Sequence, residues 1–190
     1  MRRTALATVI LLSAGSTAFA QQPPVLAAQP STRGTAVVAL EGPDGSGLTP
    51  ASISIDYGQP HLRGRTLHTE NLVPLDQVWR FGANTSTTLE TGVDVTIGSL
   101  VVPAGKYSLY ALPSASGWKL IINKNTGQWG TRYSAEHDLG RVDLIETALA
   151  VPTESFTVWL IPASPQSGKA SGELRFAWGN RQHSTTWSVR

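Results

Sequence analysis

Residues 52–57, with the sequence Ser-Ile-Ser-Ile-Asp-Tyr, alternate strictly between polar and apolar side chains. Successive side chains of a β-strand point to opposite faces of its sheet, so Ile53, Ile55 and Tyr57 share one face. The polar partners share the other face. This alternation is typical of a strand that is buried on one side and hydrated on the other.

The same period of two recurs at residues 118–123, 155–161 and 174–178. Segments rich in Gly, Pro, Asn and Asp separate these runs, and such segments let a chain reverse direction. One of them, Gly179-Asn180, has the composition of a two-residue hairpin turn and predicts a hairpin at that point.

Short strands at regular spacing predict an all-β fold, an antiparallel β-sandwich of jelly-roll-like type, for one domain over residues 33–190. Only residues 74–79 and 134–139 resemble helices, so we expect one or two very short helices. A parallel α/β sheet is excluded because it needs longer crossover helices.

The N-terminus has the pattern of a cleavable secretory signal peptide over residues 1–20. Arg2 and Arg3 precede a short apolar run, which ends in Ala18-Phe19-Ala20. Residues 21–32 are polar and Pro-rich, and we expect a flexible leader there. We therefore expect export to the periplasm or the exterior, with no membrane span after signal cleavage.

Charge and cysteine content exclude several classes of function. The chain has 15 Lys and Arg against 13 Asp and Glu, and loss of the signal peptide would equalise them at 13. No basic run remains, so we expect no nucleic-acid partner. With no Cys, the chain has no disulfide, thiol nucleophile or cysteine metal site.

A polar cluster lies over residues 57–65 and 78–84. Its candidate ligand-binding residues are Tyr57, Arg63, Arg65, Arg80 and Asn84. The planar fork of an arginine donates two parallel hydrogen bonds, which suits a carboxylate or another anion. In the alternative interpretation, the arginines fasten long loops by bonding backbone carbonyl groups.

Trp129 and Tyr133 complete the candidate site. An exposed Trp in a loop can stack on a sugar or an aromatic ligand. We prefer the interpretation that Trp129 anchors its loop in the core, because fully exposed Trp is rare. Trp118 and Trp178 fall on apolar faces and are expected in the core, whereas Trp159 faces the other way.

No metal site or cofactor is expected from the motifs, and no motif supports a particular catalytic centre. The separation of His61 and His68 matches no common metal-ligand spacing. Ser116-Gly117-Trp118-Lys119 has the letters of a Ser-x-x-Lys motif but straddles a turn and a strand, where the two side chains do not meet. His183 is expected on the surface.

Several motifs together resemble domain-of-unknown-function family 2911, a family of exported bacterial proteins. The matching segments cover roughly residues 50–145 and include Ser54-Ile55-Asp56-Tyr57-Gly58-Gln59-Pro60, Arg63-Gly64-Arg65, Val78-Trp79-Arg80-Phe81-Gly82-Ala83-Asn84, Pro103-Ala104-Gly105-Lys106-Tyr107 and Trp129-Gly130. The resemblance implies an exported, β-rich protein and brings no activity with it. It departs at His68-Thr69, where an aromatic residue or Gly is common.

These observations favour a non-catalytic binding or interaction module with a small-molecule, glycan or protein ligand. One alternative is a hydrolase of envelope polymers or glycosides, in which a carboxylate pair acts while the arginines orient the substrate. The other is a structural envelope protein.

Overall fold

The computed structural model describes residues 26–164 and 168–190. The expected signal peptide, residues 1–20, and the first part of the expected leader lie outside the described residues. No helix within the described ranges is long and apolar enough to cross a membrane.

The described chain forms nine β-strands in a single antiparallel sheet, which confirms the all-β prediction. The order in the sheet is β1-β2-β3-β6-β7-β8-β9-β4-β5. The strands are β1 (Thr32–Leu40), β2 (Ala51–Gln59), β3 (Thr87–Thr91), β4 (Val95–Ile97), β5 (Leu100–Val102), β6 (Gly105–Leu112), β7 (Trp118–Asn123), β8 (Asp138–Pro162) and β9 (Ser171–Val189).

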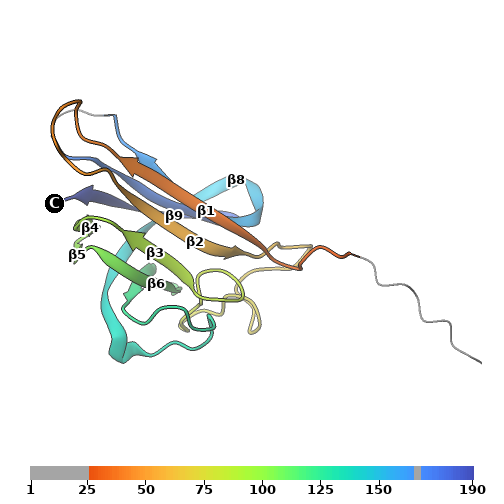
Figure 1. Cartoon of the computed structure of the whole chain (residues 1–190). Helices are drawn as coiled ribbons and strands as arrows, with labels where there is room; N and C mark the ends of the chain where they lie inside the picture. Colours follow the sequence, from red (N-terminus) through yellow and green to blue (C-terminus); the bar gives the residue numbers. More distant parts are fainter. Residues whose placement is uncertain (1–25, 165–167) are drawn as a thin grey trace, which may run out of the picture.

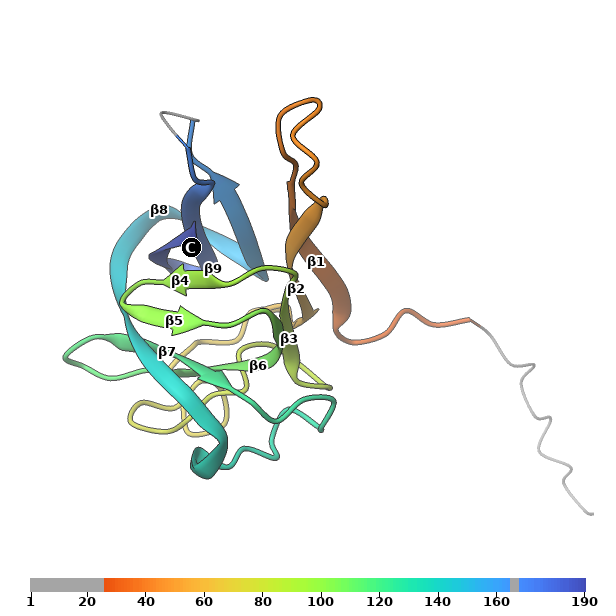
Figure 2. The same ribbon diagram turned by 60° about the vertical axis from the view of Figure 1, so that its left-hand side comes forward.

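The long strand β8 allows the sheet to fold over on itself. Its first part pairs with β7 as far as Leu144, and its later part, from Ile145 on, pairs with β9. Figure 2 shows β8 curving along one side of the molecule between these partners. As a result, β1 and β2 contact β8, although neither is its neighbour in the sheet (Figure 1).

Aromatic rings fill the space enclosed by the sheet. Phe156 of β8 makes edge contacts with Tyr57, Trp79 and Phe81, and Phe81 also contacts Phe176 of β9. Trp118 and Trp178 are buried with this cluster, as predicted. Trp187 is also buried although its sequence neighbours are polar, because alternation along β9 places it on the inner face.

Two local predictions are wrong. Residues 74–79 form turns and a bridge to Ala111 instead of a helix. The other segment expected to be helical, residues 134–139, does contain a 3₁₀ helix, η1 (Ala135–His137). No hairpin forms at Gly179-Asn180, because β9 runs through these residues. Gly179 has a positive φ of 64°. This conformation instead accommodates a bulge, because the register between β8 and β9 shifts between the pairs Ala148–Arg181 and Thr153–Gly179.

Candidate functional site

The irregular segment that connects β2 to β3, residues 60–86, builds most of the candidate site. Its beginning is fixed to β8, since Leu62 donates its N–H to the carbonyl of Glu154 over 2.8 Å and Phe156 donates to Pro60 over 2.9 Å. Several residues of the segment adopt left-handed backbone conformations, namely Arg63, His68, Val73, Asp76, Phe81 and Asn84. A segment of this irregularity is held by its surroundings and not by regular pairing.

Arg80 lies between two fixed points of that segment. Before it, Trp79 and Ala111 exchange backbone hydrogen bonds of 2.7 and 2.9 Å. After it, Gly130 donates its N–H to the carbonyl of Asn84 over 2.9 Å. A Cβ atom at Gly130 would lie 3.1 Å from Cδ of Arg80, so the missing side chain of Gly130 leaves room for the arginine.

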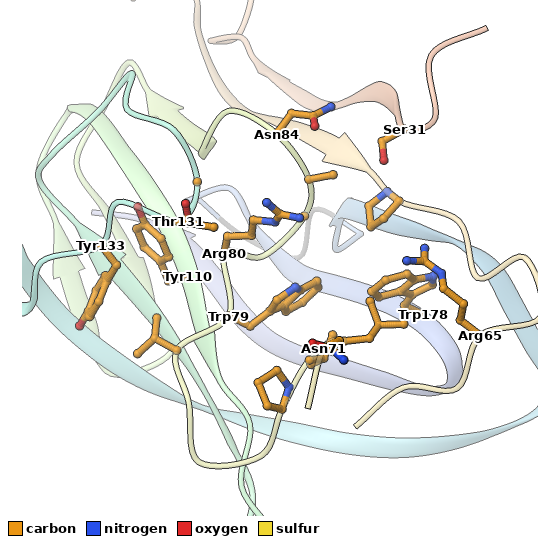
Figure 3. Close-up of a pocket in the computed structure, with 18 residues that line it drawn as sticks. Ser31, Arg65, Asn71, Trp79, Arg80, Asn84, Tyr110, Thr131, Tyr133 and Trp178 are labelled. Carbon is orange, nitrogen blue, oxygen red and sulfur yellow. The ribbon is translucent and has the colours of Figure 1, made fainter. Parts of the chain in front are cut away.

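A cavity of about 360 Å³ opens beside Arg80 (Figure 3). Its charged lining residues are Arg65 and Arg80, and no Asp or Glu of residues 26–164 and 168–190 lines it. Its neutral polar lining residues include Ser31, Asn71, Asn84 and Thr131, and its aromatic ones are Trp79, Trp178, Tyr110 and Tyr133. The cavity is therefore positively charged.

The guanidinium of Arg80 makes no hydrogen bond or ion pair within residues 26–164 and 168–190, although the side chain is half-buried. The other arginines of these ranges are either bonded, as Arg33, Arg65, Arg141, Arg175 and Arg181 are, or exposed. Arg80 thus combines partial burial with five unused N–H donors.

Arg65 is exposed at the edge of the cavity and is tied to its own turn. Its Nε donates to the carbonyl of Leu62 over 3.0 Å, and its Nη2 donates to that of His61 over 2.6 Å. These bonds are the ones expected of a loop fastener. They also fix the direction of the guanidinium, whose Nη1 bonds no residue that the structure describes.

The two indoles that line the cavity are stacked, with Trp79 and Trp178 centroids 5.9 Å apart and an interplanar angle of 17°. The Nε1 of Trp178 donates to the carbonyl of Glu154 over 3.1 Å. Figure 3 shows Arg80 beside Trp79 and Arg65 beside Trp178. The two cationic groups thus lie next to a rigid aromatic wall.

Tyr133 lines the cavity with its ring, because its hydroxyl is occupied elsewhere. The hydroxyl donates to Oδ2 of Asp138 over 2.7 Å and accepts from Arg141 over 3.1 Å. Burial, followed by the neighbouring Asp138, raises the pKa of Tyr133. The ring contacts that of Tyr110 at 4.9 Å, so this wall of the cavity is also fixed.

Four of the seven predicted site residues line the cavity together, namely Arg65, Arg80, Asn84 and Tyr133. Tyr57 does not, because it is buried in the core against Phe156. Arg63 is exposed outside the lining, and its backbone N–H donates to Oε1 of Glu154 over 2.6 Å.

Trp129 is also outside the lining. It is 49% exposed, so the preferred interpretation of this residue as a loop anchor is wrong. Its backbone forms an isolated bridge with Thr85. The backbone of Trp129, and not its ring, therefore helps to position residues 84–85.

Sequence reasoning missed part of the lining: Ser31, Asn71, Trp79, Thr131 and Trp178. Trp79 directly precedes Arg80, and this adjacency was the one signal in the sequence that could have drawn attention to it. Ser31 and Trp178 come from distant parts of the chain, and only the folding of the sheet brings them to the cavity.

A second titratable cluster surrounds His183, which is buried, contrary to the surface position expected. Its ring lies between Trp118 and Phe176, at centroid distances of 4.1 and 5.0 Å, and its Nε2 is 3.0 Å from Oε2 of Glu146. Burial lowers the pKa of His183 to about 4, although Glu146 opposes this effect. Within the described ranges, no three His, Cys, Asp or Glu side chains are grouped to hold a metal.

No curated protein and no solved structure matches the chain. A family model, described as a protein of unknown function (DUF2911), matches residues 46–186. This range includes the segment of residues 60–86 and most of the sheet on which it lies. The chain therefore belongs to the DUF2911 family.

Proposed function

We propose that this protein is a non-catalytic binding protein that holds a small anionic ligand in the cavity beside Arg80. The observation that carries the proposal is the half-buried residue Arg80, whose guanidinium has no partner among the described residues and lies in a cavity that no described carboxylate lines. Removing a charge from water is costly unless an opposite charge or hydrogen-bond acceptors replace the water. An anionic ligand supplies both.

The chemistry of an arginine supports the same ligand class. A guanidinium pairs with a carboxylate or phosphate through two parallel hydrogen bonds, and these are stronger than bonds between neutral groups. Arg65 adds a second positive charge whose direction is fixed by its bonds to His61 and Leu62. A cavity that is organised before binding loses less conformational entropy when it takes up its ligand.

The lining supports binding over catalysis. In the part of the chain that the structure describes, it includes no Asp, Glu, His, Lys or Cys, the side chains that most often act as general base or nucleophile. A glycoside hydrolase would place two carboxylates on opposite sides of the substrate. The structural-envelope alternative has no comparable observation in its favour. We retain export to the periplasm or the exterior as part of the proposal, on the pattern of residues 1–20.

The test is a thermal-shift and calorimetric screen of the purified protein against small carboxylates, phosphates and sulfates. A ligand that binds only the folded state raises its melting temperature, by an amount that grows with ligand concentration. The Arg80→Gln variant removes the charge but keeps a polar side chain, shorter than that of arginine. Arg132→Gln is the matched control, because Arg132 is exposed and outside the lining.

We expect anions to raise the melting temperature of the parent protein and of Arg132→Gln, but not of Arg80→Gln. Equal shifts in all three proteins would place the anion elsewhere and contradict the proposal. Turnover of an anionic substrate, lost in Arg80→Gln, would contradict the non-catalytic part alone.

A further inference from the structure

The neutral groups around the cavity indicate what the rest of the ligand is. We infer that the ligand is a polyhydroxylated anion, a single sugar-like unit that carries one carboxylate or phosphate group. This inference rests on the proposed anion-binding function and adds the chemistry of the uncharged part of the ligand.

Four neutral polar side chains line the cavity together with Arg80: Ser31, Asn71, Asn84 and Thr131. None of the four side chains forms a hydrogen bond with a residue in the described part of the chain. Hydroxyl and amide groups can both donate and accept. A ligand hydroxyl can also donate and accept. A molecule with several hydroxyl groups can therefore form a hydrogen bond with each of the four side chains, either as donor or as acceptor.

The cavity holds little further positive charge. Besides Arg80, its charged lining residue is Arg65, and two of the three nitrogens of Arg65 already donate to backbone carbonyls. A ligand with several anionic groups would leave some of them without a matching cation. One anionic group combined with neutral hydroxyls fits this distribution better.

The two indoles of the lining do not offer a free face for a flat ligand. Trp79 contacts the rings of Phe81, Trp118, Phe156 and Trp178. It is 8% exposed, and Trp178 is 5% exposed. A nucleobase or another arene binds best by stacking on an open ring.

The volume of the cavity limits the size of the ligand. About 360 Å³ is near the lower end of the range of small-molecule pockets, about 300–1,000 Å³. A cavity of this size suits one sugar unit.

Four probes separate the parts of this inference. D-glucuronate and glucose 6-phosphate have both the anion and the hydroxyls, glucose lacks the anion, and cyclohexanecarboxylate lacks the hydroxyls. We expect calorimetry to give an affinity at least about tenfold higher for glucuronate, glucose 6-phosphate or both than for glucose or cyclohexanecarboxylate. The reason is that a probe without the anion, or without the hydroxyls, loses one or more hydrogen bonds. A preference between glucuronate and glucose 6-phosphate identifies the anionic group.

Two cavity variants test the neutral groups. Thr131→Val keeps the shape of the side chain without its hydroxyl, and Asn84→Gly removes the amide while tolerating the φ of 62° at that position. We expect each to weaken binding of the hydroxylated anion about threefold or more, without affecting cyclohexanecarboxylate. Thr126→Val, exposed and outside the lining, is the matched control.

The outcomes distinguish this inference from the proposed function. If cyclohexanecarboxylate binds as tightly as glucuronate and glucose 6-phosphate, and Arg80→Gln abolishes binding of all three, the sugar-like ligand is wrong while the anion site stands. If none of the three anions binds in a way that depends on Arg80, both are overturned.

Discussion

Gly58 lies so close to Ala83 that a Cβ atom at position 58 would be 1.9 Å from the carbonyl oxygen of Ala83. The segment that carries Arg80 and Asn84 therefore rests directly on the backbone of β2. No side chain fits between them, and the position of the candidate site depends on the absence of one.

We predict that Gly58→Ala displaces residues 81–84 and destabilises the protein by about 2 kcal/mol, since a methyl group in a filled space forces the backbone to move. Binding of anions should weaken as well. Urea denaturation and calorimetry measure the two effects. Gly92→Ala is the control, because a Cβ there would be 3.3 Å from its nearest neighbour, Cβ of Ala51. Equal stability of the two variants would contradict the close packing at Gly58.

The two arginines of the cavity should differ in their effect on folding. Arg65→Ala removes the hydrogen bonds to His61 and Leu62, and we expect a loss of about 1 kcal/mol, kept small by solvent exposure. Arg80→Gln removes no hydrogen bond with a described residue and should leave the free energy of unfolding unchanged or slightly increased. A marked loss of stability in Arg80→Gln, measured in urea, would indicate that Arg80 is a fastener instead.

Asp138 should be a larger contributor to stability than its neighbour Asp143. Its carboxylate accepts hydrogen bonds from Asn123, Tyr133 and Arg141, and its side chain is only 13% exposed. We expect Asp138→Ala to cost about 2–3 kcal/mol, because buried donors lose their acceptor. Asp143→Ala removes only an exposed pair with Lys119 and should cost less than about 0.5 kcal/mol. Similar losses in both variants would contradict this account.

His183 should make the protein less stable in acid. Its pKa is near 4 in the folded protein, below the value of 6.5 expected after unfolding, so the unfolded chain binds the proton more readily in this window. The stability that depends on neutral His183 is complete above pH 6.5 and is lost as the pH falls toward 4. The loss amounts to about 3 kcal/mol.

Urea denaturation between pH 7.5 and 4 measures this loss. His183→Phe keeps an aromatic ring between Trp118 and Phe176 and should flatten the dependence. Glu146, Arg181 and His68 also influence the charge of His183, so the comparison is made against exposed His137→Gln. An unchanged slope in His183→Phe would show that another group is responsible.

The strand pattern was readable in the sequence because it is a local property. Ile53, Ile55 and Tyr57 alternate with polar residues, and all three are buried. The interpretation of Gly179-Asn180 was wrong because a positive φ serves a bulge as well as a turn. Whether a bulge or a turn is formed depends on how β9 pairs with β8, and this pairing joins residues that are distant in the sequence.

The candidate site was only partly predictable for a related reason. Arg65, Arg80 and Asn84 belong to one segment, and their clustering in sequence was enough to group them. Tyr57 lies just before this segment, in β2, and the alternation of side chains along that strand places it in the core. His183 has polar neighbours on either side, and its burial depends on Trp118 and Phe176, which reach it through tertiary packing.

Strand β8 belongs to both halves of the folded sheet, because it bonds to β7 at its beginning and to β9 later. Neither half therefore has a complete set of backbone partners without the other. Folding must wait for contacts between distant parts of the chain, which slows it relative to proteins built from local contacts. Unfolding should be a single cooperative event, in which tryptophan fluorescence and the circular dichroism of the backbone change at the same urea concentration.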